Sequence, residues 1–389
     1  MRSEPNYNTI PVGQLGIIAL PGCEELANKI DNYLIRWRFQ RNSEHKDTLA
    51  FAGYEKSTYL INMDFPRFGT GEGKAALNQT VRGYDIYILC DVFNYGVTYK
   101  MYGMTVPMSP DEHFANLKRA ISAIEGKAKR VSVIMPMLYE GRQHKRSSRE
   151  SLDCAMMLQE LHNMGVENFI TFDAHDPRVM NAIPLCGFES ISPAYQMIKA
   201  AVNNVDNLKI NKDNIMIISP DEGGMSRCIY YSTVLGVELG MFYKRRDFSR
   251  IVDGRNPIIA HEFLGDNVEG KDVIIVDDMI SSGESMIEVA TKLKELKAAR
   301  IYIFSAFGLF CNGFDAFDKA FQEGIIDRVF TTNLIYGTPE LLSKDWYVRV
   351  DMSKYLSYII DTLNHDTSIS DLLDPAEKIN TLLEKKGLK

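Results

Sequence analysis

Apolar runs rich in β-branched residues alternate with helical patterns along this chain, and this alternation constrains the fold more than any other feature. The runs occupy residues 84–92, 130–136, 168–175, 214–221, 272–278 and 300–307. Residues 109–126 and 147–165 are expected to be helices, because each opens on a serine followed three residues later by a glutamate, the spacing of a capping box. Pro110 fits the first helical position, and Gly165 fits a helix stop. Apolar strands between helices predict an α/β fold of mainly parallel sheets flanked by helices.

The length and charge of the chain bound its class. A chain of 389 residues is expected to form two domains. Its net charge of −7 argues against a general nucleic-acid-binding protein, which would carry a basic face. No apolar run approaches the ~20 residues needed to cross a bilayer, and the first residues lack the apolar core of a signal peptide. The six cysteines include no Cys-x-x-Cys pair. We therefore expect a cytoplasmic protein with no nucleic-acid or membrane partner.

Charged side chains follow three of the predicted strands at the point where each strand ends. They are Asp173, His175 and Asp176 after the first, Asp221 and Glu222 after the second, and Asp277 and Asp278 after the third. Open α/β sheets bind their ligands at the carboxyl ends of the strands. We therefore expect the binding site among these side chains.

The loop after the third strand has the composition of an anion-binding cradle. Its residues are Ser281, Ser282, Gly283, Glu284 and Ser285. Backbone N–H groups at a helix start bind phosphate, whereas Asp277 and Asp278 just upstream suit a sugar diol or a hard cation. Together these features describe a site for a phosphorylated sugar. The alternative is an ordinary turn in which Ser285 caps the next helix and Glu288 completes a capping box.

Segment 277–285 resembles the phosphoribosyl-pyrophosphate motif of type I phosphoribosyltransferases and of ribose-phosphate pyrophosphokinases. Four further segments resemble the pyrophosphokinase family alone. Segment 135–146 resembles the family segment with an Arg-Gln pair, and 172–177 resembles the one with the metal-binding histidine. Segment 219–224 resembles the family's second aspartate loop, and 243–248 resembles its catalytic Lys-Arg-Arg loop. The family's adenine-binding segment and the strand after it are resembled by residues 67–73 and 78–89, and its C-terminal end by residues 368–373. Because the matches keep their order, the chain is identified by resemblance as a divergent member of the ribose-phosphate pyrophosphokinase family.

The resemblance implies a fold and an activity. The fold is two tandem domains of the type I phosphoribosyltransferase kind, expected at 15–190 and 191–350, followed by a C-terminal helical segment and tail at 351–389. The activity is transfer of the diphosphoryl group of ATP to the C1 hydroxyl of ribose 5-phosphate, giving phosphoribosyl pyrophosphate and AMP. Mg²⁺ is the implied cofactor, ATP and ribose 5-phosphate are the implied partners, and a homo-oligomer from dimer to hexamer is expected.

The resemblance also assigns residues to roles. Lys244, Arg245 and Arg246 are the implied catalytic residues, which would neutralise the transferring phosphates from a mobile flap over 247–263. His175 and Asp221 are the implied metal ligands. Asp277, Asp278 and the loop 281–285 are the implied ribose-phosphate site.

The implied ATP site is where the sequence departs from the family. Its residues are Phe68, Thr70, Glu72, Arg142 and Gln143, with the hairpin around Phe68 expected to reach the adenine, in a neighbouring subunit as one possibility. Thr70 and His144 each replace the usual aspartate. Residues 69–74 are not a P-loop, because Phe68 stands in place of the first glycine and Ala75 in place of the Ser or Thr that holds magnesium.

Two segments look additional to the family pattern. They are a long loop at 91–113 and a tail after residue 373 that has the pattern of one short amphipathic helix. Two other functions stay open at this point. One is a phosphoribosyltransferase that uses phosphoribosyl pyrophosphate, which would not need Lys244–Arg246 or a second α/β half. The other is a non-catalytic regulatory relative that binds nucleotide, which the replacements Thr70 and His144 would favour.

Overall fold

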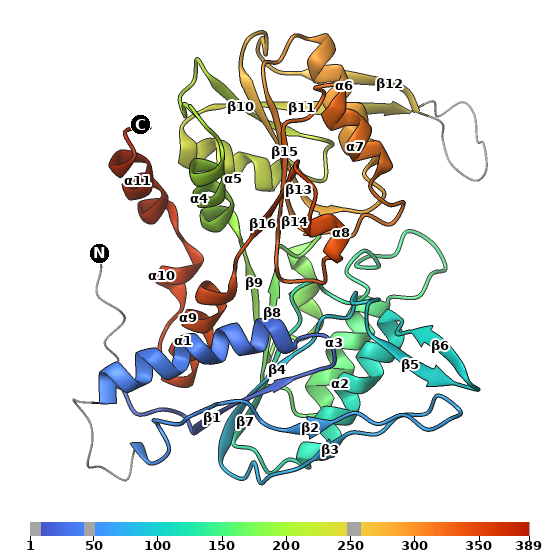
Figure 1. Ribbon diagram of the computed structural model, residues 1–389, viewed down its shortest axis with the longest axis vertical. Helices are drawn as coiled ribbons and strands as arrows, with labels where there is room; N and C mark the ends of the chain where they lie inside the picture. The colour runs from blue at the N-terminus through green and yellow to red at the C-terminus, as the bar shows by residue number, and fades with distance from the viewer. Residues whose placement is uncertain (1–8, 43–50, 247–257, 389) are drawn as a thin grey trace. The chain divides into compact units, whose positions relative to one another are not determined.

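The computed structural model describes residues 9–42, 51–246 and 258–388, with the backbone alone at 42, 244–246 and 258–261 (Figure 1). The chain divides into two compact units. Unit 1 comprises Met1–Ser192, Asn333–Tyr336 and Asp351–Leu373, and unit 2 comprises Pro193–Thr332, Gly337–Val350 and Asp374–Lys389. The chain thus returns to unit 1 twice after entering unit 2. The domain bounds expected from the sequence stay a prediction.

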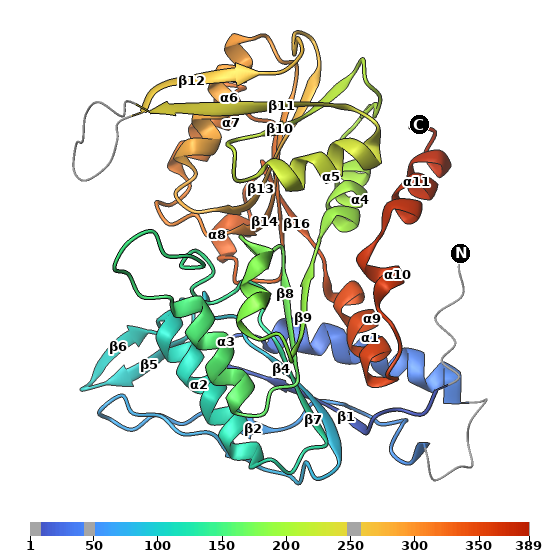
Figure 2. The same ribbon diagram turned by 180° about the vertical axis from the view of Figure 1, so that it is seen from behind.

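Unit 1 is built on a five-stranded, all-parallel sheet in the order β1-β4-β7-β8-β9. Its strands are β1 (Gln14–Ala19), β4 (Tyr84–Leu89), β7 (Arg130–Ile134), β8 (Asn168–Phe172) and β9 (Gly187–Ile191). Its helices are α1 (Glu24–Asn42), α2 (Pro110–Ile124), α3 (Asp153–Asn163), α9 (Ser353–Asn364), the short α10 (Ser370–Leu373) and a 3₁₀ helix at Pro177–Ala182. One core cluster joins α2 and α3 to one face of the sheet, and both views show α1 and α9 together on the opposite side (Figures 1 and 2).

Unit 2 is built on a seven-stranded sheet in the order β12-β11-β10-β13-β14-β15-β16. Its strands are β10 (Ile215–Ser219), β11 (Glu238–Arg246), β12 (Ile258–Leu264), β13 (Asp272–Ile280), β14 (Ile301–Gly308), β15 (Arg328–Thr332) and β16 (Tyr347–Val350). Its helices are α4 (Ala194–Asn204), α5 (Met225–Leu235), α6 (Glu284–Glu295), α7 (Asp315–Gln322), α8 (Pro339–Leu342) and α11 (Ala376–Lys385). Every pair is parallel except β11 with β12, so the predicted α/β fold with mainly parallel sheets is confirmed.

All six predicted apolar runs form strands, namely β4, β7, β8, β10, β13 and β14. The helix predicted at 109–126 is α2, with Pro110 at its start and Ser109 and Glu112 bonded to each other's backbone as a capping box. The helix predicted from residue 147 is wrong at its start. Helix α3 begins at Asp153 without a side-chain cap, and Glu150 bonds the hydroxyl of Ser147 in an exposed segment outside the helix. The helix thus begins one residue before its first buried side chain, Cys154.

The two additional segments both have regular structure. The 91–113 segment contains a two-stranded hairpin, β5 (Thr98–Met101) and β6 (Met104–Pro107), before α2 begins. The predicted tail helix is α11, which packs against α4 and α5 through Ile379 and Leu383. Two-residue strands β2 (Met63–Asp64) and β3 (Ala76–Leu77) pair at the base of the 67–73 loop. Across the described ranges, no helix combines the length and apolarity that spanning a membrane requires.

Candidate functional site

The paired aspartates lie near the end of the central strand of unit 2. Strand β13 continues to Ile280, so Asp277 and Asp278 are inside the strand rather than at the end predicted at residue 278. Arg227, in the first turn of α5, pairs with both: its Nη1 is 3.7 Å from Asp277 Oδ1 and 3.9 Å from Asp278 Oδ1. All three side chains are largely buried, at 12 %, 21 % and 5 % exposure. The guanidinium of Arg227 therefore compensates the charge of two carboxylates that have little contact with solvent.

Burial is the main reason that the pKa of Asp277 lies well above its usual value, and the neighbouring carboxylate of Asp278 raises it further. Arg227 opposes both effects only in part. Two carboxylates this close resist ionising together. A ligand that donates hydrogen bonds, such as a sugar diol, or a cation would relieve the repulsion.

The loop after β13 leads directly into α6. Gly283, in the left-handed conformation with φ 86°, is the N-cap, and α6 starts at Glu284 without a side-chain cap of the usual geometry. The alternative in which Ser285 caps the helix is therefore wrong. A Cβ on Gly283 would lie 2.2 Å from the ring of Phe317 in α7, so both the backbone and the packing require glycine here. The hydrogen bond from Glu284 N to Ser282 Oγ is long, at 3.4 Å, so the N–H groups at this helix start suit an anion.

Asp221 closes the turn between β10 and α5. Its Oδ1 accepts hydrogen bonds from the N–H groups of Gly223 at 2.8 Å and Gly224 at 3.3 Å. Helix α5, which follows this turn, contacts β13, because Cys228 Sγ donates to Val276 O at 3.4 Å. Asp221, just after β10, and the two aspartates, in the last part of β13, thus lie toward the carboxyl ends of adjacent strands. One oxygen of Asp221 has a structural role, which the sequence did not predict.

Strand β11 extends past the end of β10. The last β10 pairing joins Ser219 to Met241, so Lys244, Arg245 and Arg246 continue beyond the edge where Asp221 lies. They pair with β12, with a register irregularity between Arg245 and Arg246. Their side chains lie outside the described atoms, as do residues 247–257 of the expected flap. The flap prediction is wrong for its last part, because residues 258–264 form β12.

In unit 1, His144 and the segment after β8 come together. His144 Nε2 lies 3.5 Å from Asp176 Oδ2, and the rings of His144 and His175 are 5.4 Å apart. Bonds from Arg178 hold the pKa of Asp176 well below its usual value. The side chain of His144 is only 11 % exposed, and its Nδ1 is buried without a partner. His144 is therefore paired with a carboxylate, that of Asp176, which follows the neighbouring strand β8.

The other expected ATP residues lie in two places in unit 1. Phe68, Thr70 and Glu72 are on the 67–73 loop, where Phe68 N bonds Glu72 O at 2.8 Å and closes the predicted hairpin. Phe68 is 55 % exposed, and Thr70 Oγ1 donates to Glu72 Oε2 at 2.9 Å. Arg142 and Gln143 follow β7 instead: Arg142 is exposed and Gln143 Nε2 donates to Ser151 O at 2.9 Å. The hairpin shape is confirmed, whereas its role stays a prediction.

Models of three known domains match most of the chain. The N-terminal domain of ribose phosphate pyrophosphokinase matches residues 15–165, a phosphoribosyl transferase domain matches 188–308, and a phosphoribosyl synthetase-associated domain matches 250–374. The chain belongs to the ribose-phosphate pyrophosphokinase family.

Individual relatives agree with this assignment. A ribose-phosphate pyrophosphokinase of Vibrio parahaemolyticus is 26 % identical over 312 residues, which cover 79 % of this chain and 90 % of the relative. One of Shewanella oneidensis is 27 % identical over 308 residues, covering 78 % and 88 %. The crystal structure of phosphoribosylpyrophosphate synthetase from Mycobacterium smegmatis superposes with a TM-score of 0.69 at 18 % identity, covering 91 % of this chain and 99 % of the other. The fold of this pyrophosphokinase family member is therefore the synthetase fold, with a type I phosphoribosyltransferase domain.

Arg227 is the site residue of this pyrophosphokinase family member that sequence reasoning missed. It stands six residues after Asp221 and fifty before Asp277. Its position in the first turn of α5, beside the end of β13, brings it to both acids. The sequence contained one weak indication of this role. A positive charge in the first turn of a helix is unfavourable next to the helix dipole, so a nearby negative group is expected to compensate.

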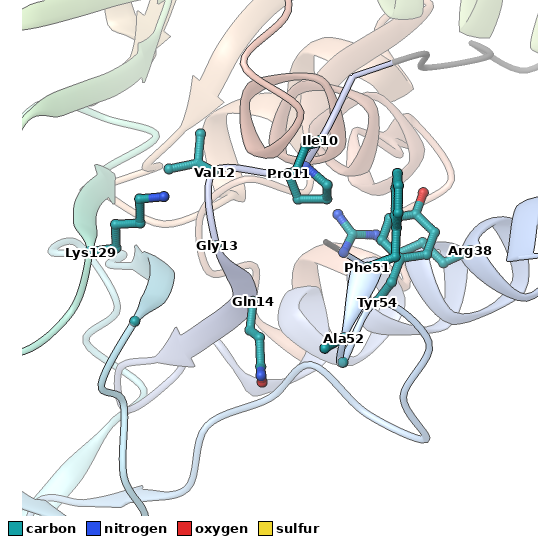
Figure 3. A pocket seen from close by; sticks show the side chains of 12 residues that line it. Ile10, Pro11, Val12, Gly13, Gln14, Arg38, Phe51, Ala52, Tyr54 and Lys129 are labelled. Carbon is teal, nitrogen blue, oxygen red and sulfur yellow. The ribbon is translucent and has the colours of Figure 1, made fainter. Parts of the chain in front are cut away.

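A cavity of about 290 Å³ in unit 1 lies at the edge of the unit 1 sheet opposite to the one where His144 and Asp176 follow their strands (Figure 3). Its lining includes Gly13, Gly83 and Lys129, which immediately precede β1, β4 and β7. Figure 3 shows Lys129 on one side and Arg38 on the other, with the segment Ile10–Gln14 between them. Because the sheet is parallel, this cavity is at the amino ends of the strands and is separate from the site at their carboxyl ends.

Proposed function

We propose that this protein transfers the diphosphoryl group of ATP to the C1 hydroxyl of ribose 5-phosphate, forming phosphoribosyl pyrophosphate and AMP. The observation that carries the proposal is one edge of the unit 2 sheet. The aspartate pair and the start of α6 lie at this edge on β13, and β11, on the other side of β10, extends Lys244–Arg246 past the same edge. A phosphoribosyltransferase would need the first two features, but not the third.

The proposed roles follow from the chemistry of each group. The start of α6 and the hydroxyls of its loop bind the 5-phosphate, and the aspartate pair accepts hydrogen bonds from the ribose diol. Lys244 and Arg246 stabilise the charge that develops on the transferring phosphates, with Arg245 beside them. Phe68 and Glu72 bind the adenine, and Arg142 and Gln143 contact the phosphates of ATP. Positioning and charge neutralisation thus supply the catalysis.

Mg²⁺ fits the donor set of this site. The described residues contain no group of three or more His, Cys, Asp or Glu side chains arranged to hold a metal by themselves. Mg²⁺ usually binds through one or two carboxylates together with substrate phosphates and water. In unit 2, Asp221, with one oxygen committed to its turn, would supply such a carboxylate. In unit 1, His175 would contact a metal or a phosphate, as the resemblance implies. Held there, Mg²⁺ would supply positive charge against the charge of the phosphates.

We further propose a cytoplasmic homo-oligomer. All six cysteines are free thiols, which suits a reducing compartment. The exposed hairpin that carries Phe68 suits a contact to a ligand held mainly by another copy of the chain.

The decisive experiment is to mix the pure protein with ATP, Mg²⁺ and ribose 5-phosphate and to measure AMP. We expect AMP without any added base. Turnover only with phosphoribosyl pyrophosphate and a base would instead indicate a phosphoribosyltransferase. Nucleotide binding without turnover would indicate a regulatory relative. Lys244→Ala and Arg246→Ala test the mechanism, because each should lower kcat and kcat/KM together by about a hundredfold or more.

A further inference from the structure

The β5–β6 hairpin belongs to the 91–113 segment, and no step of the proposed reaction uses it. It packs against the 67–73 loop. At the tip of the hairpin, Tyr102 and Gly103 adopt φ 48° and 79°, and Tyr102 N donates to Gly69 O at 2.8 Å. This bond attaches the hairpin to the residue that directly precedes Thr70.

A second contact fixes the residue that directly follows Thr70. Gly71 has a φ of 94°, in the left-handed region, and a Cβ built there would lie 2.8 Å from the sulfur of Met101. The side chain of Met101 thus packs directly on the backbone of Gly71. Only glycine allows both the conformation and this close approach.

A third contact acts through Arg67. Its Nη1 donates to Gly71 O at 3.0 Å, and its guanidinium lies 4.7 Å from the ring centroid of Tyr99. Tyr99 in turn donates its hydroxyl to Glu112, whose carboxylate is 3.8 Å from Arg67 Nη1. The side chain of Arg67 is only 9 % exposed. The half-buried ring and carboxylate and the largely buried guanidinium thus form one support under the loop.

We propose that the β5–β6 hairpin is a positioning element that holds the 67–73 loop in its nucleotide-binding conformation. The contacts fall on both sides of Thr70 and leave the side chains of Phe68, Thr70 and Glu72 exposed. A loop that is already ordered loses less conformational freedom when its ligand binds. The hairpin therefore acts on nucleotide affinity and not on the sugar site of unit 2. This inference rests on the proposed function of the loop.

The test compares KM for ATP with KM for ribose 5-phosphate in Tyr99→Ala and Met101→Ala. Each variant should raise KM for ATP about fivefold or more, while KM for ribose 5-phosphate changes less than about twofold. Tyr99→Phe keeps the ring under Arg67 and should restore most of the ATP affinity. Lys100→Ala is the matched control, because Lys100 lies between the two positions on the same strand and its exposed side chain points to the opposite face.

Unchanged KM for ATP in both alanine variants, or an equal rise for both substrates, would overturn the inference. Thermal unfolding of each variant shows whether a loss is global. Wild-type turnover reports separately on the proposed function. If the wild type makes no AMP, calorimetric ATP affinities of the same four variants still decide the role of the hairpin, with the same expected order.

Discussion

At the residue scale, the aspartate pair of β13 combines two opposed requirements. Burial raises the pKa of Asp277, whereas a hydrogen-bond acceptor for a diol works best when ionised. Arg227 offsets the repulsion at 3.7 and 3.9 Å, which are ion-pair distances too long for hydrogen bonds. A ligand that donates hydrogen bonds to Asp277 and Asp278 would therefore be bound favourably.

We expect Asp277→Asn combined with Asp278→Asn to weaken ribose 5-phosphate binding by about tenfold or more while sparing ATP, since each lost charged hydrogen bond is worth about 1.5–3 kcal/mol. In the wild type, affinity for the sugar phosphate should rise with pH as Asp277 loses its proton, and Asp277→Asn should flatten that rise. Titration calorimetry with each ligand across pH measures both effects. Equal weakening of both ligands would point to a shared metal or to misfolding.

From the sequence alone, Gly283→Val is predicted to weaken ribose 5-phosphate binding by crowding the phosphate cradle. The structure contradicts its use as a probe of the cradle alone. The added side chain would meet Phe317 in the core of unit 2, and the φ of 86° would be strained. We therefore expect this substitution to destabilise unit 2, so it cannot report on phosphate binding alone.

Thr70 has a more defined role than its sequence position indicates. Because its hydroxyl donates to Glu72, the oxygen that remains presents acceptor lone pairs. An acceptor suits the exocyclic amine of adenine and not the carbonyl of guanine, but an uncharged hydroxyl discriminates less strongly than a carboxylate. We expect a preference for ATP over GTP in kcat/KM that rises about tenfold in Thr70→Asp, which corresponds to about 1.4 kcal/mol.

Thr70→Val controls for the loss of the hydroxyl without the gain of charge. It should loosen Glu72 and should not improve the ATP/GTP ratio. An unchanged ratio in Thr70→Asp would mean that Thr70 does not face the base, and the alignment of the hairpin with the family would then be in doubt.

At the element scale, α9 is held in unit 1 by a buried charge network. Asp361 accepts two hydrogen bonds from Arg38 of α1, at 3.0 and 2.8 Å, and also pairs with Arg41. Burial alone would raise the pKa of Asp361, but the two guanidinium groups hold it below its usual value. His365, just after α9, bonds the carbonyl of Asp361 at 2.7 Å. Ring stacking of Trp37 on Tyr358, 4.3 Å apart, packs the same two helices together.

We expect this network to weaken unit 1 at mildly acid pH. Burial lowers the pKa of His365 to about 4 from its ordinary 6.5, so between these values the unfolded chain binds a proton that the folded protein does not. The contribution of His365 is thus fully present above about pH 6.5 and is lost as the pH falls toward 4, by about 3 kcal/mol at most. His365→Gln should reduce the pH dependence of the free energy of unfolding, measured with urea. An unaltered slope would contradict the assignment.

At the scale of the whole molecule, the resemblance assigns the ATP-binding loop to unit 1 and the catalytic residues to unit 2, and it implies that a second subunit supplies the contact to adenine. Phe68 and Glu72 belong to the exposed 67–73 loop of unit 1, whereas Lys244 belongs to β11 of unit 2. If adenine is bound by the hairpin of a neighbouring copy, two inactive variants can complement each other. One hybrid site would then combine an intact hairpin with an intact lysine.

We expect mixed oligomers of Glu72→Ala with Lys244→Ala to regain up to about a quarter of wild-type activity, since random pairing of two variants restores about one site in four. Mixing after dissociation and reassociation, followed by measurement of AMP, tests this expectation. Each variant alone is the control. No recovery in verified hybrids would place the whole site within one chain, and a 44.1 kDa monomer with full activity would exclude the shared site.

Local pattern alone determined the α/β class, the six apolar strands, the capping box at Ser109 and the tail helix, because each depends on residues within a few positions of one another. The family could also be identified from the sequence, because the motifs that resemble it follow one another in the family's order along the chain. Contacts between distant residues could not be inferred from such patterns. Arg227 reaches β13 only because α5 packs beside that strand, and Asp361 meets Arg38 across 323 positions of sequence. Tertiary packing likewise decided that α3 starts at Asp153 and that Gly283 faces Phe317, because burial against other elements overrides local preference.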